Sequence, residues 1–325
     1  MEFSRILIRA TNWVGDAVMC LPALRAIRER FPKAHIAVLA KPWVADLYRR
    51  ESFADEVLLY EGKSIWKEAA KLRGRGFDCA ILLQNAFEAA LVTWLARIPN
   101  RIGYDRDGRG FLLTQAVRVP ERDEIPAHER FYYLELLRRS GLIEKLPATS
   151  EIRLEAGAAV KRQKLVGVSP GAAYGTAKRW LPERFAEAAA TLAQVRGSSI
   201  ALFGSKEERA LCEQIAQMLD GENVTNYAGQ TSLRQFIDLA ASCEIFLTND
   251  SGAMHIASAL GIPTVAIFGA TNDIGTGPTG ANARVVREHV ECSPCLLREC
   301  PIDHRCMIRV SATRVVKEAL DLLVD

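Results

Sequence analysis

The 325-residue sequence predicts an α/β fold of two doubly wound, Rossmann-like domains that face a cleft. Short runs of apolar, β-branched residues alternate with amphipathic helical segments, a pattern typical of parallel strands buried on both faces. The alternation stops once, over residues 144–164, in a charged stretch that contains Pro147, Ser150 and Gly157. The chain is also longer than one core usually needs. We therefore expect one domain over residues 1–155 and another over residues 156–325.

The expected elements follow that rhythm in each half. The strands of the first half are expected at 6–8, 36–40, 56–60 and 80–83, and its clearest helices at 17–31 and 87–96. The strands of the second half are expected at 165–169, 199–203, 223–227, 245–248 and 264–268, and its helices at 182–194, 206–219, 233–241 and 252–260. A last helix, residues 311–325, begins with an N-cap serine and is a candidate to pack back on the N-terminal domain.

Composition and charge exclude several classes of protein. Apolar residues make up 49% and charged residues 25% of the chain, as in ordinary globular proteins. The net charge of +3 is too small to predict a nucleic-acid partner. No apolar run reaches the ~18 residues of a membrane helix, and the N-terminus lacks the pattern of a signal peptide. We therefore expect a cytoplasmic protein that binds no nucleic acid.

The turn after the first predicted strand reads Asn12-Trp13-Val14-Gly15-Asp16. In an open α/β sheet this turn usually faces a ligand. It lacks the glycine-rich fingerprint of dinucleotide-binding proteins and carries a lone carboxylate instead. Asp16 is therefore a candidate for chemistry, whereas Trp13 is either a platform for a ligand or a core residue of the turn.

Two further turns suggest phosphate binding. In "LTNDSGAMHIASALGIPTVAIFGA", residues 247–270, a strand ends and a helix begins near Gly252, with His255 in its first turn. Helix N-termini bind phosphate well, but simple N-capping by Asp250 or Ser251 beside a surface histidine explains the same pattern. In "SPGAAYGTAKRWLP", residues 169–182, Lys178 is suited to neutralise a diphosphate, and the alternative is a loop of solvated charges.

Three motifs occur in one order along the chain: "NWVGD" followed by "LPALRAIRERFP", then "PGAAYGTAKRW", then "NDSGAMHIASALGIPTVAIFG". Together they resemble the ADP-heptose:lipopolysaccharide heptosyltransferases of glycosyltransferase family nine, over nearly the whole chain. The middle motif and the tail "CSPCLLRECPIDHRC" look most like heptosyltransferase II, the branch that adds the second heptose to the first heptose of the inner core. A relative with another acceptor, such as heptosyltransferase I or III, is the main alternative. A nucleotide-sugar binding protein without catalysis is the alternative outside the enzymes.

The resemblance implies the GT-B architecture, with an N-terminal domain for the acceptor and a C-terminal domain for the nucleotide sugar. It implies inverting transfer from ADP-L-glycero-β-D-manno-heptose, with no cofactor and no metal, to a lipid A-Kdo-heptose acceptor. Such an enzyme of the Gram-negative cell envelope would lie on the cytoplasmic face of the inner membrane as a peripheral protein.

By the same resemblance, Asp16 corresponds to the proposed base and Lys178 to the cation that offsets charge on the diphosphate. Asp250 would contact heptose hydroxyls. The phosphates would be held by the helix N-terminus with its nearby residues Ser251, Gly252 and His255.

The resemblance also matches three positions of this chain to the nucleotide-binding residues of the family. Thr231, in "GQTSL", falls where the family's backbone contacts adenine. Glu207 falls near the ribose-binding carboxylate, with Glu208 as the alternative. Part of the family has adjacent threonines before the lysine; here Ala173 and Tyr174 stand in that region, and Thr176 is the candidate to replace their hydroxyls.

The acceptor implied by the resemblance is anionic, so positive charge should face it. Candidate acceptor-binding residues cluster in "RIPNRIGYDRDGRGF": Arg101, Arg106 and Arg109. Arginine binds carboxylate and phosphate bidentately, although a solvated loop explains the cluster equally well. For Trp43, Phe53 and Trp66, contact with a membrane surface is one interpretation, and buried packing is the favoured one.

Four cysteines lie close together in sequence: Cys292, Cys295, Cys300 and Cys306. Their spacing differs from the paired motifs of zinc ribbons and fingers. Reduced thiols packed in a small lobe are the favoured interpretation, a structural zinc site is the alternative, and disulfides are the least favoured in a reducing compartment.

Overall fold

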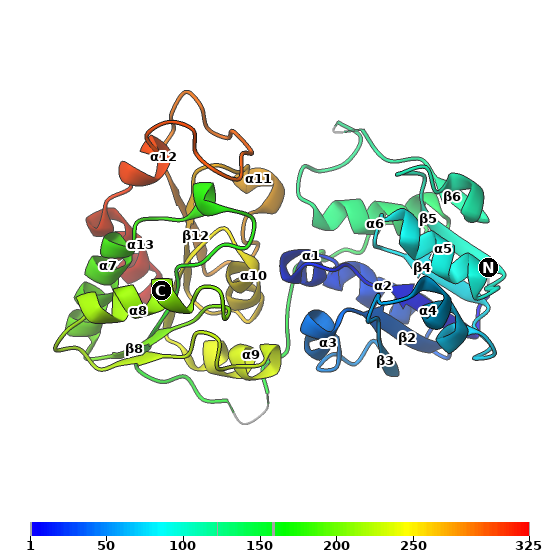
Figure 1. The fold of residues 1–325 in the computed structure, drawn as a ribbon, viewed down its shortest axis with the longest axis horizontal. Helices are drawn as coiled ribbons and strands as arrows, with labels where there is room; N and C mark the ends of the chain where they lie inside the picture. Colours follow the sequence, from blue (N-terminus) through cyan, green and yellow to red (C-terminus); the bar gives the residue numbers. More distant parts are fainter. Residues whose placement is uncertain (1, 122, 158–159, 325) are drawn as a thin grey trace. The chain divides into compact units, whose positions relative to one another are not determined.

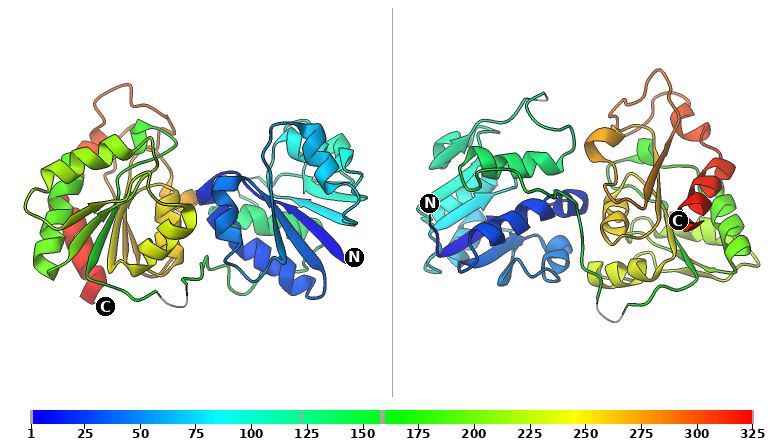
Figure 2. Two further views of the ribbon diagram at one scale, coloured as in Figure 1. Left: turned by 60° about the horizontal axis from the view of Figure 1, so that its bottom comes forward. Right: turned by 180° about the vertical axis from the view of Figure 1, so that it is seen from behind.

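The computed structural model describes residues 2–121, 123–157 and 160–324 and divides into two compact units, Met1–Ile152 and Arg153–Asp325 (Figure 1). Each unit contains a six-stranded sheet in which all paired strands are parallel. Helices cover both faces of each sheet (Figure 2). The α/β fold class is confirmed, and each unit is described below by itself.

The sheet of the first unit has the strand order β3-β2-β1-β4-β5-β6. Its strands are β1 (Arg5–Arg9), β2 (His35–Ala40), β3 (Glu56–Leu59), β4 (Cys79–Leu82), β5 (Asn100–Tyr104) and β6 (Gln115–Val117). Its helices are α1 (Val14–Met19), α2 (Leu21–Arg30), α3 (Pro42–Tyr48), α4 (Ile65–Leu72), α5 (Phe87–Leu95), the 3-10 turn η1 (Gly110–Leu112) and α6 (Arg130–Arg139). This order reverses between β1 and β4, which makes the carboxyl ends of those two strands the expected ligand site.

One core of the first unit lies between the sheet and the helices α4 and α5. Leu7, Ala37 and Leu82 point from the strands toward Leu72 and Ala90 of these helices. Alternate residues of a strand face opposite sides of a sheet, so the neighbouring strand residues are buried on the other face. Apolar strands buried on both faces are what the sequence predicted for a parallel sheet.

The sheet of the second unit has the order β12-β11-β10-β7-β8-β9. Its strands are β7 (Leu165–Ser169), β8 (Ser199–Leu202), β9 (Val224–Asn226), β10 (Ile245–Asn249), β11 (Thr264–Phe268) and β12 (Ala283–Arg287). Its helices are η2 (Thr176–Lys178), α7 (Pro182–Arg196), α8 (Arg209–Met218), α9 (Leu233–Ser242), α10 (Gly252–Ala259), α11 (Asp273–Thr276), α12 (Arg305–Ile308) and α13 (Ala312–Val324). Numbered from β7, the connectivity repeats that of the first unit, and the reversal falls between β7 and β10.

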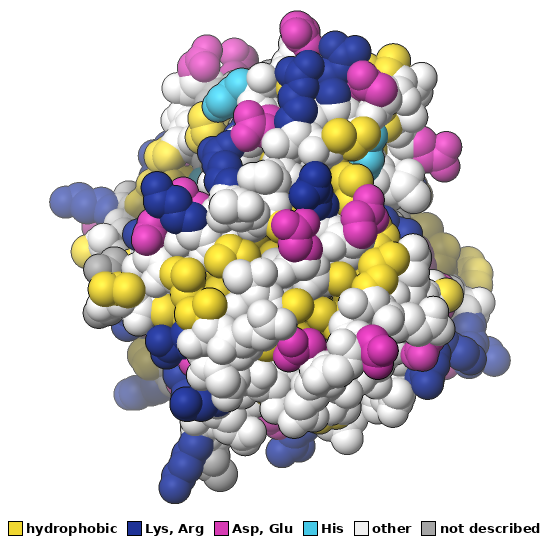
Figure 3. All heavy atoms as spheres, turned by 90° about the vertical axis from the view of Figure 1, so that its left-hand side faces the viewer, with side chains coloured by type: hydrophobic (Ala, Val, Ile, Leu, Met, Phe, Trp, Pro, Cys, Tyr) yellow, Lys and Arg dark blue, Asp and Glu magenta, His cyan; other side chains and the backbone are white. Residues whose placement is uncertain are grey.

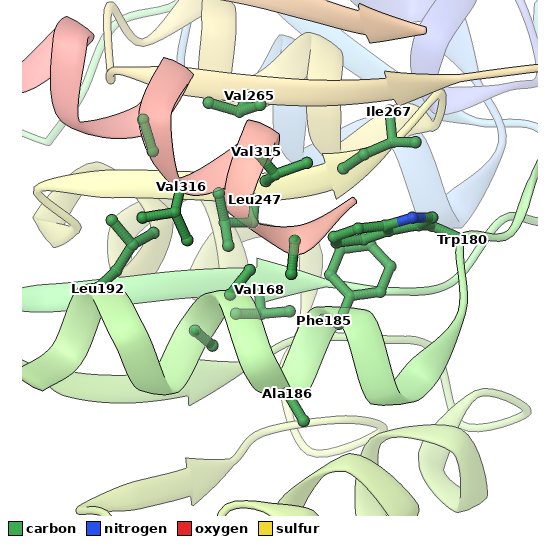
Figure 4. Close-up of a cluster of buried hydrophobic side chains, with 14 of the residues drawn as sticks. Val168, Trp180, Phe185, Ala186, Leu192, Leu247, Val265, Ile267, Val315 and Val316 are labelled. Carbon is green, nitrogen blue, oxygen red and sulfur yellow. The ribbon is translucent and has the colours of Figure 1, made fainter. Parts of the chain in front are cut away.

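The largest core of the second unit packs α7 and α13 against one face of this sheet (Figure 4). Val315 and Val316 of α13 meet Val265 and Leu247 of the sheet in the same buried cluster as Leu192 of α7. The last helix therefore packs on its own unit, and that it also packs back on the N-terminal domain stays a prediction. The physical reason for its packing on the second unit is its apolar stripe, which completes the cover over β11 and β12.

The structure adds elements that the sequence did not predict. Strands β5, β6 and β12 were missed because each is short or rich in charged residues, and the expected helix 17–31 is two helices that meet at Cys20. The described residues of the stretch 144–164 contain neither helix nor strand. On the face shown in Figure 3, basic and acidic side chains are interspersed with apolar ones.

The helices were also compared with the requirements of a membrane span. Among the described residues, no helix combines the length and apolar character needed to cross a membrane.

Candidate active site

Asp16 lies on the first turn of α1, at the carboxyl end of β1. Trp13 is the N-cap of this helix and is 61% exposed, so it is not a core residue of the turn. The buried Tyr133 of α6 donates its hydroxyl to Asp16 Oδ1 over 3.3 Å. Asp16 therefore stands, half-buried, at the predicted ligand edge with one face held by a phenol.

The negative charge of Asp16 contributes to raised pKa values of two groups, one within α6 and one at its N-cap. Burial raises the pKa of the Tyr133 phenol well above its usual value, and the neighbouring Asp16 carboxylate adds to this rise. Burial raises the pKa of Glu129 as well, with the charge on Asp16 as the next cause. A phenol with a raised pKa keeps its proton at neutral pH, so Tyr133 remains a hydrogen-bond donor to Asp16.

In the second unit, the reversal point of the sheet brings two loops together. Lys178 follows β7, Asp250 follows β10, and the Lys178 Nζ lies 2.6 Å from the Asp250 Oδ2. The hydroxyl of Thr271, after β11, donates to the same carboxylate oxygen over 2.6 Å. The side chains of Lys178 and Asp250 are only 14% and 5% exposed. The structure thus places a buried ion pair where an open α/β sheet binds its ligand.

Asn249 connects the loop after β7 to the end of β10 by two hydrogen bonds. Its side-chain amide donates to the Pro170 carbonyl over 2.7 Å and accepts from the Trp180 backbone N–H over 2.9 Å. Trp180 is itself buried, and its indole N–H donates to the Val310 carbonyl over 3.1 Å. Sequence reasoning missed Asn249 and Thr271 as positioning residues; their only signal was the location of each at or near the carboxyl end of a buried strand.

The N-terminus of α10 begins at Gly252, with Ser251 as its N-cap. The Ser251 hydroxyl accepts from the Met254 backbone N–H, so capping by serine is present, whereas Asp250 pairs with Lys178 instead of capping the helix. His255 is 6% exposed and is therefore not the surface histidine of the alternative interpretation. Small residues at the start of this helix leave its N-terminus open to an anion.

The turn after β8 contains both candidate ribose carboxylates, and the two differ in their exposure to solvent. Glu207 is exposed. Glu208 is half-buried, accepts from the Ser205 backbone N–H over 2.8 Å, and faces the loop after β7. A Cβ added at Gly171 would stand 2.0 Å from the Glu208 Oε1, so only glycine allows this close approach.

Two threonine candidates lie in neighbouring turns. Thr231 directly precedes Ser232, the N-cap of α9, and the Gly229 backbone N–H of its turn donates to the Gly204 carbonyl over 3.0 Å. Thr231 therefore lies in a turn adjacent to that of Glu208. Thr176 is the exposed first residue of η2, two residues before Lys178.

The acceptor arginines require correction. Arg109 is completely buried, and its guanidinium donates to the carbonyls of Tyr104 and Gln84, so it is a structural residue that no surface acceptor can reach. Burial lowers the pKa of Arg109 to about 10. Arg101 is half-buried and donates to the carbonyls of Leu112 and Ile98. Arg106, with 55% of its side chain exposed, is the candidate that keeps a surface position.

The four clustered cysteines are free thiols, so the disulfide interpretation is wrong. Burial raises the pKa of Cys306, and the charges of Cys292, Cys300 and Cys295 raise it further. Among the residues that the structure describes, no three histidine, cysteine, aspartate or glutamate side chains form a group suited to a metal ion. The zinc alternative therefore gains no support from the arrangement of the sulfur atoms.

Comparison with known proteins decides the family. The profile described as "Glycosyltransferase family 9 (heptosyltransferase)" matches residues 65–305. The chain belongs to glycosyltransferase family 9. It is a glycosyltransferase, as the three ordered motifs indicated.

Relatives of this family 9 member resemble it over most of its length. The lipooligosaccharide heptosyltransferase 2 of Campylobacter jejuni is 30% identical over 97% of this chain and 98% of its own. The lipopolysaccharide heptosyltransferase 2 of Escherichia coli is 33% identical over 87% and 88% of the two chains.

Solved structures extend the family match to the fold. The E. coli ADP-heptose LPS heptosyltransferase II superposes with a TM-score of 0.84 at 30% identity and covers 98% of both chains. The E. coli heptosyltransferase WaaC, solved with ADP, superposes with a TM-score of 0.77 at 18% identity over 98% of this chain and 99% of its own. The GT-B fold class predicted from the sequence is therefore confirmed.

Proposed function

We propose that this family 9 glycosyltransferase moves L-glycero-D-manno-heptose from ADP-L-glycero-β-D-manno-heptose to the first heptose of the lipopolysaccharide inner core, the reaction of heptosyltransferase II. The observation that carries the proposal is the Lys178–Asp250 pair at the reversal point of the second sheet. The pair supports the proposal because a cation suited to a diphosphate and a carboxylate suited to sugar hydroxyls lie side by side, in the turn that leads into the N-terminus of α10. Near-full-length similarity to heptosyltransferase 2 enzymes supports the choice of acceptor.

The reaction is a single displacement with inversion. Asp16 takes the proton of the acceptor hydroxyl as that oxygen bonds to the anomeric carbon of the heptose. The bond between this carbon and the phosphate oxygen breaks, and ADP leaves with the electron pair. Lys178 and the α10 N-terminus offset the charge that develops on the diphosphate. This chemistry needs no metal ion or other cofactor.

Each of the two predicted domains binds one of the two substrates. Residues 1–155 bind the acceptor and residues 156–325 bind the donor; the cleft between them remains a prediction. Lys178 contacts the diphosphate and Asp250 the heptose hydroxyls. The phosphates are held at the α10 N-terminus and its neighbouring side chains: Thr176, Ser251, Gly252 and His255.

For the ribose we propose Glu208 in place of Glu207, because Glu208 faces the loop after β7 whereas Glu207 is exposed. The backbone at Thr231 contacts adenine. Replacing each glutamate by glutamine tests the choice between the two neighbours. Glu208→Gln should weaken ADP binding, and Glu207→Gln, the matched control, should leave it unchanged. The reverse result would return the assignment to Glu207.

On the acceptor side, we propose Arg106 as the arginine that meets an anionic group, since Arg101 and Arg109 bind backbone carbonyls. The acceptor, lipid A-Kdo-heptose, is a membrane lipid. The enzyme should therefore work as a peripheral protein on the cytoplasmic face of the inner membrane.

The deciding experiment incubates the protein with ADP-heptose and a truncated lipid A core that ends in one heptose, and weighs the products by mass spectrometry. We expect the mass of one added heptose. Asp16→Ala should lower kcat by about 10²- to 10⁴-fold, the usual contribution of a general base, and leave ADP-heptose affinity unchanged. Near-normal turnover of this variant would overturn the role of Asp16.

A further inference from the structure

Five exposed aromatic side chains of the first unit each follow a different strand of its sheet. They follow β3, β2, β1, β4 and β5 in spatial order: Trp66, Trp43, Trp13, Phe87 and Phe111. Their exposed fractions range from 40% to 77%. Because the carboxyl ends of parallel strands meet at one edge of a sheet, these residues, here called the aromatic row, share the edge on which Asp16 lies.

Contacts link two pairs of neighbouring turns within the row. The Trp43 indole N–H donates to the Asn12 carbonyl, next to Trp13, over 2.8 Å. The rings of Phe87 and Phe111 have centroids 6.1 Å apart. Five strands spaced by about 4.8 Å give the row a length of roughly 19 Å, which exceeds a single sugar ring.

The second unit offers a comparison within the same chain. Its sheet has the same connectivity, yet none of its described tryptophan or phenylalanine side chains is exposed. Its large exposed hydrophobic residues after strands are one tyrosine, Tyr174, and aliphatic residues such as Ile274, Leu296 and Ile302. The fold therefore does not require exposed aromatic residues at this edge, and five of them along one edge mark a binding surface.

Polar side chains also lie in the turns that carry Trp43 and Phe87. The Lys41 Nζ lies 5.5 Å from the Trp43 ring centroid and 4.6 Å from that of Tyr60. Asn85, after β4, donates to the Tyr132 hydroxyl over 2.9 Å. Aromatic faces with a few placed polar groups suit a ligand that is apolar on its ring faces and rich in hydroxyl groups, as a saccharide is.

We propose that the aromatic row is the platform on which the oligosaccharide of the acceptor lies, with several sugar rings stacked on its side chains. The inference rests on the proposed function, and it adds that the enzyme recognises an extended saccharide and not only the heptose that reacts. Asp16 follows the same strand as Trp13, at the middle of the row, so a saccharide stacked on Trp43 and Trp13 presents a hydroxyl to the base. Lys41 supplies positive charge for an acidic sugar in the chain.

The test measures kinetics with a lipid-free acceptor, the fully deacylated inner-core oligosaccharide that ends in one heptose. The variants are Trp43→Ala and Trp66→Ala, and the matched control is Trp94→Ala. Trp94 is also exposed, but it lies at the far end of α5, toward the amino edge of the sheet. These positions are at the surface, and thermal melts confirm that each variant is folded.

Loss of a stacked aromatic side chain should raise the KM for this oligosaccharide by at least about fivefold, and leave kcat and the KM for ADP-heptose near those of the unmodified enzyme. Trp94→Ala should match the unmodified enzyme. Absence of transfer by the unmodified enzyme would overturn the proposed function itself. Transfer with an unchanged acceptor KM in both row variants would overturn the inference alone. Loss of binding to anionic lipid vesicles with an unchanged oligosaccharide KM would show that the row docks on a bilayer, and would also overturn it.

Discussion

Replacing Lys178 by methionine is the sharpest test of the donor site. Methionine keeps the apolar stem and removes the cation, which leaves the Asp250 carboxylate, only 5% exposed, with the Thr271 hydroxyl. Breaking one partner of a buried pair typically costs about 3 to 5 kcal/mol. We expect about 3 kcal/mol here, because Thr271 still donates to Asp250. In a unit of this size that corresponds to a fall in Tm of roughly 6 to 12 °C.

The same pair predicts opposite effects on nucleotide affinity. Lys178→Met removes a charge-assisted hydrogen bond to the diphosphate, which is worth about 1.5 to 3 kcal/mol, or roughly 10- to 100-fold in Kd. Asp250→Asn leaves Lys178 without its carboxylate, so the lysine is freer to bind phosphate and ADP should bind more tightly. Both variants should nevertheless unfold at lower temperature than the unmodified protein when no ligand is present.

Thermal melts with and without ADP, together with titration calorimetry using ADP alone, measure both quantities. ADP is the correct probe because it lacks the heptose that Asp250 would contact. If Lys178→Met binds ADP as tightly as the unmodified protein, Lys178 does not contact the diphosphate. If both variants change the ADP affinity in the same direction, the proposed competition between Asp250 and the diphosphate is refuted.

Three further predictions concern other parts of the molecule. Gly171→Ala places a Cβ 2.0 Å from Glu208 Oε1, so calorimetry should show weaker ADP binding, and unchanged affinity would contradict the ribose role of Glu208. Arg109→Ala leaves buried carbonyls unpaired and should lower the unfolding free energy by at least about 3 kcal/mol in urea titrations; a change in acceptor KM without destabilisation would restore it as a binding residue. Glu124 accepts hydrogen bonds from Glu121 and Arg139, which help to hold its pKa at about 2, so its stabilising effect is present above about pH 4.5 and is lost as the pH falls to about 2. Glu124→Gln should unfold more easily at pH 7 and match the unmodified protein near pH 2, and a pH-independent difference would disprove the linkage.

The turns of the candidate active site could be predicted because each follows a buried, β-branched strand in the sequence. Asp16, Lys178 and Asp250 all stand at such strand ends, and the sheet order then places Lys178 and Asp250 together. The local sequence pattern does not indicate the order of the strands in a sheet. The direct pairing of Lys178 with Asp250 was therefore visible only in the structure. Tyr133 lies 117 residues from Asp16, and nothing near either residue in the sequence indicates their contact.

Burial of polar side chains is the other property that sequence patterns could not supply. Arg106 and Arg109 are three positions apart in one basic segment, yet one is exposed and the other is completely buried among carbonyls. The tryptophans show the reverse case. Composition favoured burial of Trp43 and Trp66, but both are exposed, whereas Phe53 is buried. A side chain's surroundings depend on the path of distant segments, which the local sequence does not encode.

The packing of α13 has a consequence for synthesis of the protein. This helix supplies Val315, Val316, Ala319 and Leu322 to the largest core of the second unit, so that core cannot be completed before these residues have left the ribosome. The first unit ends roughly 160 residues earlier. At about 5 to 20 residues per second, it has roughly 8 to 32 s in which to fold alone. During that interval the first unit exists with its own core complete while the largest core of the second unit still lacks α13.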